Sequence, residues 1–379
     1  MKFLGLGQDK GTLTIVLKDG VPSRWNNVSQ MSAWAFEGGV KAMKKVCLRY
    51  LSQEDILALE LSYERILSAV EAVLRAHGKG QAQMPPKPAV FPRKGRYSYF
   101  HAMPAYVASS DICGIKWLGR ASHNPKLYGL PQFTGLLVLN DPETGVPIAV
   151  MDCRWITAVR TAAVSVITAL CCANSGPKTL GIVGTGLQGR FHALMMVRAF
   201  PTLDTLYVSN RSSVGLEAFL SDVGPRLQVR LVPAIPEELV RNSDIVVSAG
   251  VRELTYHLDW IAPGTLCIGL DLARAWSPEV LSGVDKTFVD DAQQFWDRYR
   301  TEPEAFSARP EVTGELSHVL MGIIPGRDSE DDRILSLNVG MAICDLALGD
   351  LIYREAEKRN IGVLLPLMEK DDLLPPLCP

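Results

Sequence analysis

Hydrophobic positions in the first part of the chain recur at two different spacings. The run over 12–18, followed by Asp19-Gly20, predicts a strand and a turn within residues 1–45. Residues 51–77 have helical spacing instead, and Ser52 can cap this helix together with Asp55 three positions later. The apolar residues of the predicted helix are Leu57, Leu61, Ile66, Val70 and Val73.

The next region has the pattern of short strands joined by turns. A proline-rich stretch over 84–96 precedes predicted strands at 97–102, 112–117 and 134–139. The segment Asp-Pro-Glu-Thr-Gly at 141–145 predicts a turn, and 146–151 the returning strand. We therefore expect an α+β region made mostly of hairpins.

From Ile156 onward, predicted strands and helices alternate. After a long helix over 156–179, the pattern gives strands at 180–183, 205–209, 245–248 and 266–269, and helices at 191–200 and 216–220. Such alternation is typical of a parallel sheet wound with helices. The pattern breaks at Pro325-Gly326. A helix from Val339 to about Glu357 is expected to pack back onto the α+β region that precedes Ile156.

A glycine-rich turn joins the first strand of this region to the helix that follows it. Gly184, Thr185, Gly186, Leu187, Gln188 and Gly189 form the pattern GxGxxG. We expect Gly184 to make the tight turn, Gly186 to let a diphosphate approach the backbone, and Gly189 to let the helix pack on the strand. The unpaired amides at the helix start would then hold the diphosphate of a dinucleotide.

The end of the second strand indicates which dinucleotide is bound. Sites that prefer NAD usually place an acidic residue there to bind the ribose hydroxyls. This chain has Asn210-Arg211-Ser212-Ser213 instead, and Arg211 can pair with a 2′-phosphate. We therefore predict NADP(H) in preference to NAD(H); the alternative is that Arg211 is a solvated surface residue.

Three cationic residues stand in apolar or glycine-rich surroundings outside the glycine turn. They are Lys87, Lys116 and Arg160. A charge on such a segment is costly to bury without a partner, so each needs an anion. A substrate carboxylate is one candidate, and an internal salt bridge or a solvent-reaching side chain is the other.

Composition and charge exclude several classes of partner. The 379 residues are 47% hydrophobic, with 39 Lys and Arg against 41 Asp and Glu, which gives no reason to expect nucleic acid or an anionic membrane as partner. Arg160 interrupts the longest apolar stretch, and the first residues lack the pattern of a signal peptide. The 8 cysteines have no metal-ligand spacing, so we expect reduced thiols, no metal and a cytoplasmic protein.

Ten short segments together resemble the ornithine cyclodeaminase/μ-crystallin family. They fall in the family's order over about residues 46–360: Met84-PPK, Met103-PAY, Gly114-IKW, His123-NPK, Gly135 to Gly145, Ile156-TAVRTAA, the glycine turn, Gly269-LD, Pro325-GR and Val339-GMA. The resemblance implies that Lys87, Lys116 and Arg160 hold the α-carboxylate of an amino acid. It also implies that Asp271 is the catalytic carboxylate, that Lys116 is a second catalytic residue, and that the protein is a homodimer.

Further cofactor contacts follow from the same resemblance. We expect Thr161, Ser248 and Asn338 to lie at the dinucleotide, although Asn338 stands where the family often has a serine. Asp271 also follows a predicted strand, and ligands of such sheets bind beyond the carboxyl ends of the strands. The alternative for Asp271 is a helix cap or a turn residue.

One position departs from the ornithine-type members of the family. They have an acidic residue immediately before the segment Ala102-Met103-Pro104, where it can pair with a distal ammonium, and this chain has His101. An imidazole does not replace a carboxylate as partner for an amine. If His101 binds the substrate, ornithine and lysine are therefore disfavoured as substrates. The alternative is that His101 is a histidine packed in the core without a role in binding.

These observations predict an α/β protein with a Rossmann-type dinucleotide-binding domain and an α+β substrate-binding and dimerisation domain. The expected boundaries are 1–45 for an N-terminal extension, 46–160 with 325–379 for the substrate domain, and 161–324 for the dinucleotide domain. The expected function is an NAD(P)-dependent oxidoreductase acting at the α-carbon of a small amino or imino acid. A cyclodeaminase that recycles NAD, or a dinucleotide-dependent binder without catalysis, stays open.

Overall fold

The computed structural model describes residues 45–93, 98–250, 254–270 and 273–369, together with the backbone of three N-terminal strands. These strands are β1 (Gln8–Asp9), β2 (Thr12–Val16) and β3 (Pro22–Trp25), and they form an antiparallel sheet. The strand expected from residue 12 is therefore confirmed as β2, whereas the turn at Asp19-Gly20 lies outside the described residues.

The larger unit of the chain, Cys47–Leu365, contains most of two eight-stranded sheets. The first has the order β19–β4–β10–β9–β8–β7–β5, with β6 paired to β7. Because β4 and β10 are parallel while β10 to β7 are antiparallel, we call it the mixed sheet. Its strands are β4 (Val46–Leu51), β5 (Ala82–Gln83), β6 (Ala89–Val90), β7 (Ser98–Val107), β8 (Ile112–Ala121), β9 (Phe133–Asn140), β10 (Pro147–Asp152) and β19 (Val363–Met368).

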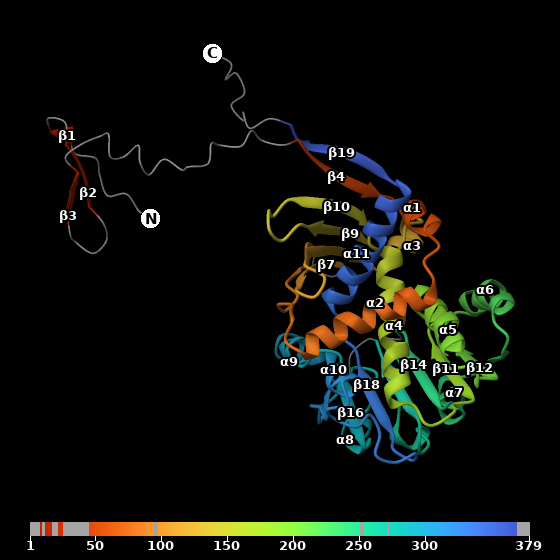
Figure 1. The fold of residues 1–379 in the computed structure, drawn as a ribbon. Coiled ribbons are helices and arrows are strands. Elements are labelled where there is room, and N and C mark those ends of the chain that lie inside the picture. Colours follow the sequence, from red (N-terminus) through yellow and green to blue (C-terminus); the bar gives the residue numbers. More distant parts are fainter. Residues whose placement is uncertain are drawn as a thin grey trace. The chain divides into compact units, whose positions relative to one another are not determined.

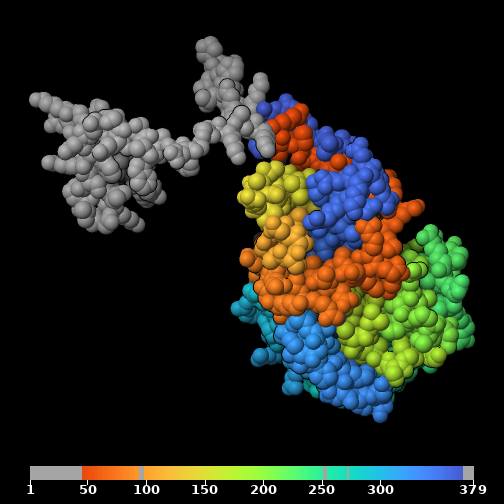
Figure 2. Space-filling model, in the orientation of Figure 1, coloured from red at the N-terminus to blue at the C-terminus, as the bar shows by residue number. Residues whose placement is uncertain are grey.

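Helices cover one face of the mixed sheet. The helix α11 (Ala342–Arg359) packs across β7, β8 and β9, and α2 (Tyr63–Gly78) packs against α11 (Figure 1). In the space-filling view the orange surface of α2 borders the blue surface of the C-terminal part of the chain (Figure 2). The short helix α3 (Asn124–Leu127) follows β8.

The single helix expected over 51–77 is two helices in the structure. The first, α1 (Gln53–Ala58), has the predicted capping box of Ser52 and Asp55. The chain then turns at Glu60, whose φ is 46°, and Ser62 caps α2 by accepting from the amide of Arg65. The turn leaves Leu57 at the surface, because α1 does not continue the apolar face of α2.

The second large sheet is parallel throughout, as the alternating pattern predicted. Its order is β13–β12–β11–β14–β15–β18–β16–β17. The strands are β11 (Thr179–Val183), β12 (Thr205–Ser209), β13 (Arg230–Pro233), β14 (Ile245–Ser248), β15 (Leu266–Gly269), β16 (Lys286–Val289), β17 (Gly314–Glu315) and β18 (Ile334–Leu337). The helices are α5 (Leu187–Ala199), α6 (Ser213–Val223), α7 (Pro236–Arg241), α8 (Pro278–Gly283), α9 (Ala292–Thr301) and α10 (Leu316–Leu320).

The helix α4 (Arg154–Cys172) leads from the mixed sheet to the parallel sheet (Figure 1). It is shorter than the expected 156–179, because the segment at Gly176, with φ 90°, turns the chain into β11. By length and hydropathy α4 meets the criteria for a membrane-crossing helix, yet most of it is buried inside the molecule. Its buried positions pack against α5, α2 and α11, which is the environment of a core helix.

The chain leaves the parallel sheet later than the sequence indicated. The sequence predicts that residues 325–379 belong to the substrate domain. In the structure, however, β18 lies between β15 and β16 of the parallel sheet. The break at Pro325-Gly326 is a turn within that sheet's connections, and the chain returns to the mixed sheet only with α11. The four residues of β18, three of them apolar, are too short a signal to reveal a pairing with strands so distant in sequence.

Candidate active site

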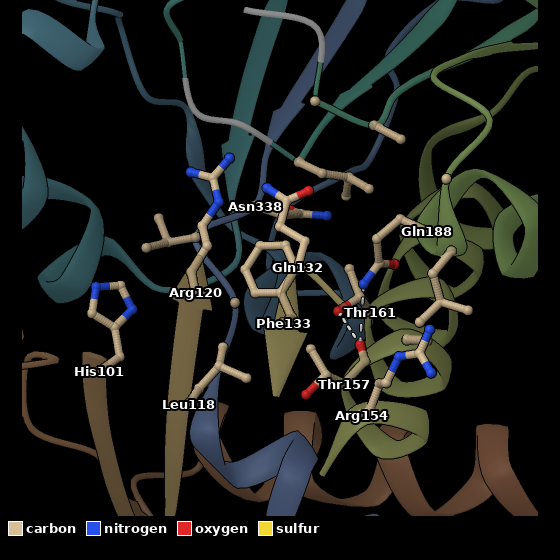
Figure 3. Close-up of a pocket in the computed structure, with 18 of the residues that line it drawn as sticks. His101, Leu118, Arg120, Gln132, Phe133, Arg154, Thr157, Thr161, Gln188 and Asn338 are labelled. Atoms are coloured by element: carbon tan, nitrogen blue, oxygen red, sulfur yellow. Dashed lines mark hydrogen bonds between the residues drawn. The ribbon is translucent and has the colours of Figure 1, made fainter. Parts of the chain in front are cut away.

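A cavity of about 940 Å³ is lined by residues from both large sheets. Its wall includes side chains from β7, β8 and α4, the start of α5, the segments after β15 and β18, and α9. In Figure 3, His101 and Arg120 lie on the side of the mixed sheet, and Gln188 lies on the opposite side at the start of α5. The cavity therefore brings the glycine turn and the segments of the mixed sheet together.

The glycine turn has the geometry that the sequence predicted. Gly184 has a φ of 101°, which is strained for any residue with a side chain. A Cβ on Gly189 would lie 1.9 Å from the carbonyl oxygen of Gly184, so only glycine lets α5 approach β11 this closely. A Cβ on Gly186 would meet nothing within 4 Å, which leaves open space at the start of the helix.

The start of α5 can accept an anion. Gly186 is the N-cap residue and supplies no side-chain hydrogen bond to the first amides. Gly186, Leu187 and Gln188 line the cavity, so the positive end of the helix faces it. Thr185 lies behind this surface, and its hydroxyl donates to the carbonyl oxygen of Gly215 at 3.0 Å.

Three polar side chains beside the glycine turn have the chemistry to bind the rest of a dinucleotide. Thr161, Gln188 and Asn338 all line the cavity (Figure 3). Gln188 Nε2 and Thr161 Oγ1 both donate to the carbonyl oxygen of Thr157, at 3.3 Å and 2.7 Å. Gln188 Oε1 and Asn338 Nδ2 are buried without a partner, and unsatisfied atoms of this kind fit a bound polar ligand.

Ser248 lies one residue away from the cavity wall. It is fully buried at the end of β14, its hydroxyl has no partner, and the following Ala249 and Gly250 line the cavity.

The segment predicted to choose between the two dinucleotides lies outside this cavity. Asn210 Nδ2 donates to the carbonyl oxygen of Ser212 at 3.0 Å, and Ser212 Oγ accepts from the amide of Gly215 as the cap of α6. Arg211 is exposed. The hydroxyl of Ser212 therefore already has a structural role, and the preference for NADP(H) stays a prediction.

The three predicted cations converge, two of them on one buried acid. Asp345, on α11, accepts through Oδ1 from Lys116 Nζ at 2.7 Å and from Arg160 Nε at 3.0 Å. Burial lowers the pKa of Lys116, although Asp345 opposes this shift. The internal salt bridge that the sequence left open is therefore present for both residues. Asp345 gave no recognisable signal, because it lies within the helical pattern about 230 residues away along the chain from Lys116.

Arg160 and Lys116 differ in what else they contact. Arg160 lines the cavity, and its terminal nitrogens face Gly340, where a Cβ would lie 3.0 Å from Nη1. Lys116 is fully buried and is not part of the cavity wall. In this structure Lys116 lies behind Arg160, where it shares Asp345 with it, so direct contact between Lys116 and a substrate is not supported by the geometry.

Lys87 belongs to a second polar group. It lines the cavity, and Nζ donates to the carbonyl oxygen of Val339 at 2.7 Å. The buried Asp290 accepts from the amides of Val339 and Gly340 at 2.9 Å and 2.6 Å. Burial lowers the pKa of Lys87 to about 7 against the opposing charge of Asp290, and burial also raises the pKa of Asp290. Asp290 was missed because an acid after a strand is a common feature.

His101 also lines the cavity, at 8% exposure. Its ring stacks on Tyr99 with centroids 4.4 Å apart, and Nε2 is buried without a partner. Burial, followed by the charges of Lys87 and Arg298, lowers the pKa of His101 to about 3. The ring is therefore neutral near pH 7.

The predicted catalytic carboxylate, Asp271, lies outside the described residues. On either side of it in the sequence, Leu270 and Arg274 line the cavity.

Sequence reasoning missed four further cations of the cavity wall, which are Arg120, Arg154, Arg274 and Arg298. The alternation of β8 could have revealed Arg120, because Lys116, Leu118 and Arg120 point to one face of a strand. Within the described ranges, no group of three His, Cys, Asp or Glu side chains is placed to hold a metal ion.

Comparisons with known proteins agree with these features. A model of the ornithine cyclodeaminase/mu-crystallin family matches residues 49–360. The chain is 33% identical over 322 residues to a nodulation efficiency protein of Rhizobium meliloti, covering 84% of this chain and 98% of the relative. It is 30% identical over 334 residues to an N-((2S)-2-amino-2-carboxyethyl)-L-glutamate dehydrogenase of Staphylococcus aureus, covering 84% and 98%. An archaeal alanine dehydrogenase dimer with bound NAD has a TM-score of 0.75 at 27% identity, covering 85% of this chain and 100% of the other.

Proposed function

Because this chain belongs to the ornithine cyclodeaminase/μ-crystallin family, we propose that it is a nicotinamide-dinucleotide-dependent oxidoreductase that acts at the α-carbon of a small amino or imino acid. One observation carries the proposal. A single cavity wall contains the anion-accepting start of α5 and the two cations Lys87 and Arg160. Two of the similar proteins are named as amino-acid dehydrogenases, and one of these is described with NAD.

In this proposal, Lys87 and Arg160 hold the α-carboxylate of the substrate. A guanidinium can bind a carboxylate through two parallel hydrogen bonds, and an ammonium adds a point charge. Lys116 and Asp345 act as positioning residues, because they fix the Nε side of Arg160 and leave its terminal nitrogens toward the cavity. The fixed carboxylate orients the α-carbon for reaction.

The bound dinucleotide supplies the hydride acceptor or donor. In the oxidative direction the bond between the α-carbon and its hydrogen breaks, two electrons leave with the hydride, and the substrate becomes an iminium. Water then adds to the α-carbon and ammonia leaves. We propose that Asp271 takes the proton from this water or from the nitrogen, and returns it in the reductive direction.

We further propose that the dinucleotide is NADP(H) rather than NAD(H). The support is the sequence Asn210-Arg211-Ser212, which lacks an acidic residue at the end of β12. We also propose a cytoplasmic homodimer. Apolar side chains that are exposed in the described part of the chain, on the face of the mixed sheet opposite α11, support the dimer; they include Phe100, Trp117 and Leu136.

The direct test is a cofactor-absorbance assay with both dinucleotides, in the oxidative direction with amino acids and in the reductive direction with keto acids plus amines. We expect turnover in at least one direction, and Asp271→Asn should lower the rate of a single turnover by about a hundredfold or more while cofactor affinity is kept. Near-normal turnover of Asp271→Asn would remove this residue from the mechanism. Net release of ammonia with no change in cofactor absorbance would indicate a cyclodeaminase, and silence in both directions a binder.

A further inference from the structure

Cationic side chains outnumber acidic ones on the described part of the cavity wall. Among the described residues, two acids, Asp290 and Glu302, line it together with six cationic side chains: Lys87, Arg120, Arg154, Arg160, Arg274 and Arg298. An α-carboxylate at Lys87 and Arg160 and a diphosphate at the start of α5 would each use part of this charge. A wall of this composition favours ligands with anionic groups.

Besides Asn338 Nδ2, which lies beside the glycine turn, two further nitrogen atoms of the wall are buried without a hydrogen-bond partner. Arg298, on α9, donates from Nη2 to Glu302 at 2.7 Å, but its Nε has no partner. His101 Nε2, on β7, also has none. A buried polar atom without a partner costs free energy, so a pair of them on one cavity wall indicates that a ligand satisfies them.

The charges around His101 favour an anionic group of that ligand. His101 lies close enough to Lys87 and Arg298 for both to lower the pKa of its imidazole, after burial has done so. The neutral ring can donate one hydrogen bond from Nε2. The same two cations would repel a side-chain ammonium. Both acids of the described wall already have partners, since Asp290 accepts from the amides of Val339 and Gly340 and Glu302 pairs with Arg298.

We propose that His101 and Arg298 bind a second carboxylate of the substrate, so that the enzyme acts on dicarboxylic amino or imino acids. This inference rests on the proposed function, because it assigns the first carboxylate to Lys87 and Arg160. Arg298 supplies charge and His101 a neutral donor. The second carboxylate belongs either to the amino-acid side chain or to a carboxyalkyl group on the nitrogen.

Binding of simple carboxylates to the full chain with saturating dinucleotide tests this site without turnover. By calorimetry, glutarate should bind roughly tenfold to a hundredfold more tightly than butyrate, as expected for one added charge-assisted hydrogen-bonded contact. Arg298→Gln should bring this ratio close to one, and Arg298→Lys should restore part of it. His101→Phe should lower the ratio as well.

A matched control lies on the same helix. Arg300 is exposed and paired with Asp297, so Arg300→Gln should leave the glutarate-to-butyrate ratio unchanged. Circular dichroism and dinucleotide affinity of each variant identify any loss of fold. Equal binding of the two ligands by the unchanged protein, or an equal effect of Arg298→Gln and Arg300→Gln, would overturn the proposal.

Turnover then separates the two sources of the second carboxylate. Oxidation of L-glutamate or L-aspartate in preference to L-glutamine or L-asparagine indicates the side chain. Reduction that needs L-glutamate together with a keto acid such as pyruvate indicates an N-carboxyalkyl group. Preference for the neutral substrates would contradict this inference alone, whereas the absence of any turnover with the glutarate preference intact would contradict the proposed function alone.

Discussion

At the scale of single residues, Gly186 and Gly189 are glycines for different reasons. Gly189 is needed for protein packing, because a Cβ there would lie 1.9 Å from the carbonyl oxygen of Gly184. Gly186 has no such neighbour, since a Cβ there would meet nothing within 4 Å. Its backbone, with φ −70° and ψ −168°, suits any residue. The space above Gly186 is therefore available to a ligand.

The two alanine variants should separate stability from cofactor binding. Gly189→Ala should lower the free energy of unfolding by about 3 kcal/mol or more through overpacking. Gly186→Ala should change it by less than about 1 kcal/mol, while dinucleotide affinity falls because the methyl group occupies ligand space. Thermal unfolding without cofactor and fluorescence titration with cofactor measure the two effects. Unchanged dinucleotide affinity in Gly186→Ala would place the diphosphate elsewhere.

Lys87 should make substrate binding depend on pH. Its pKa of about 7 means that the ammonium is charged below this pH and loses its proton as the pH rises through it. Carboxylate binding needs the charged form, so the affinity for pyruvate, which stays ionised throughout, should decrease above pH 7. In Lys87→Arg the guanidinium stays charged, and this decrease should disappear. Inhibition constants measured from pH 6 to about 9 test this; identical profiles for the two proteins would exclude Lys87 as the titrating group.

At the scale of elements, the sequence predicted half of the eight strands of the parallel sheet. The strands β11, β12, β14 and β15 were expected within a residue of their observed bounds. The sequence did not predict β13, β16, β17 and β18, because short segments with polar flanks show little hydrophobic periodicity. The break between α1 and α2 was missed for a related reason, since the turn at Glu60 interrupts an otherwise regular apolar spacing.

The turn between β12 and α6 should decide cofactor preference. If Arg211 binds a 2′-phosphate, Arg211→Ala should weaken NADP(H) binding roughly tenfold to a hundredfold and leave NAD(H) binding almost unchanged. Arg226, exposed just beyond the other end of α6, offers a matched control in Arg226→Ala. Dissociation constants for both dinucleotides are the measurement. A preference for NAD(H) that persists in Arg211→Ala would refute the NADP(H) proposal.

At the scale of the whole molecule, helices cover one face of the mixed sheet, and the other face exposes apolar side chains within the described residues. Alternation along β7, β8 and β9 directs Met103, Leu118 and Leu137 toward the core. On the other face Phe100 stacks on Trp117 with centroids 5.5 Å apart, and Trp117 pairs with Leu136 across the strands. A contiguous apolar patch of this kind fits a second copy of the chain.

Charges placed in that patch should separate the proposed dimer. Trp117→Glu combined with Leu136→Glu should convert the dimer to a monomer in light scattering, because two buried carboxylates per subunit are costly at an interface. Leu170→Glu is a control, since Leu170 is an equally apolar and exposed residue on α4, at 57% exposure. An unchanged mass in the double variant would exclude this face, and a monomeric starting protein would exclude the dimer itself.

The sequence by itself determined the parts of this protein that depend on local patterns. The glycine turn, the alternation of strands and helices, and the cations in apolar segments follow from short-range spacing. They identified the dinucleotide fold and several residues of the cavity wall, among them Gly186, Lys87 and Arg160. Only the tertiary structure decided how the charges are paired. Asp345 meets Lys116 and Arg160, and Arg298 shares the cavity wall with His101, across long separations in sequence. Such pairings depend on how the sheets and helices pack, and a local pattern carries no information about them.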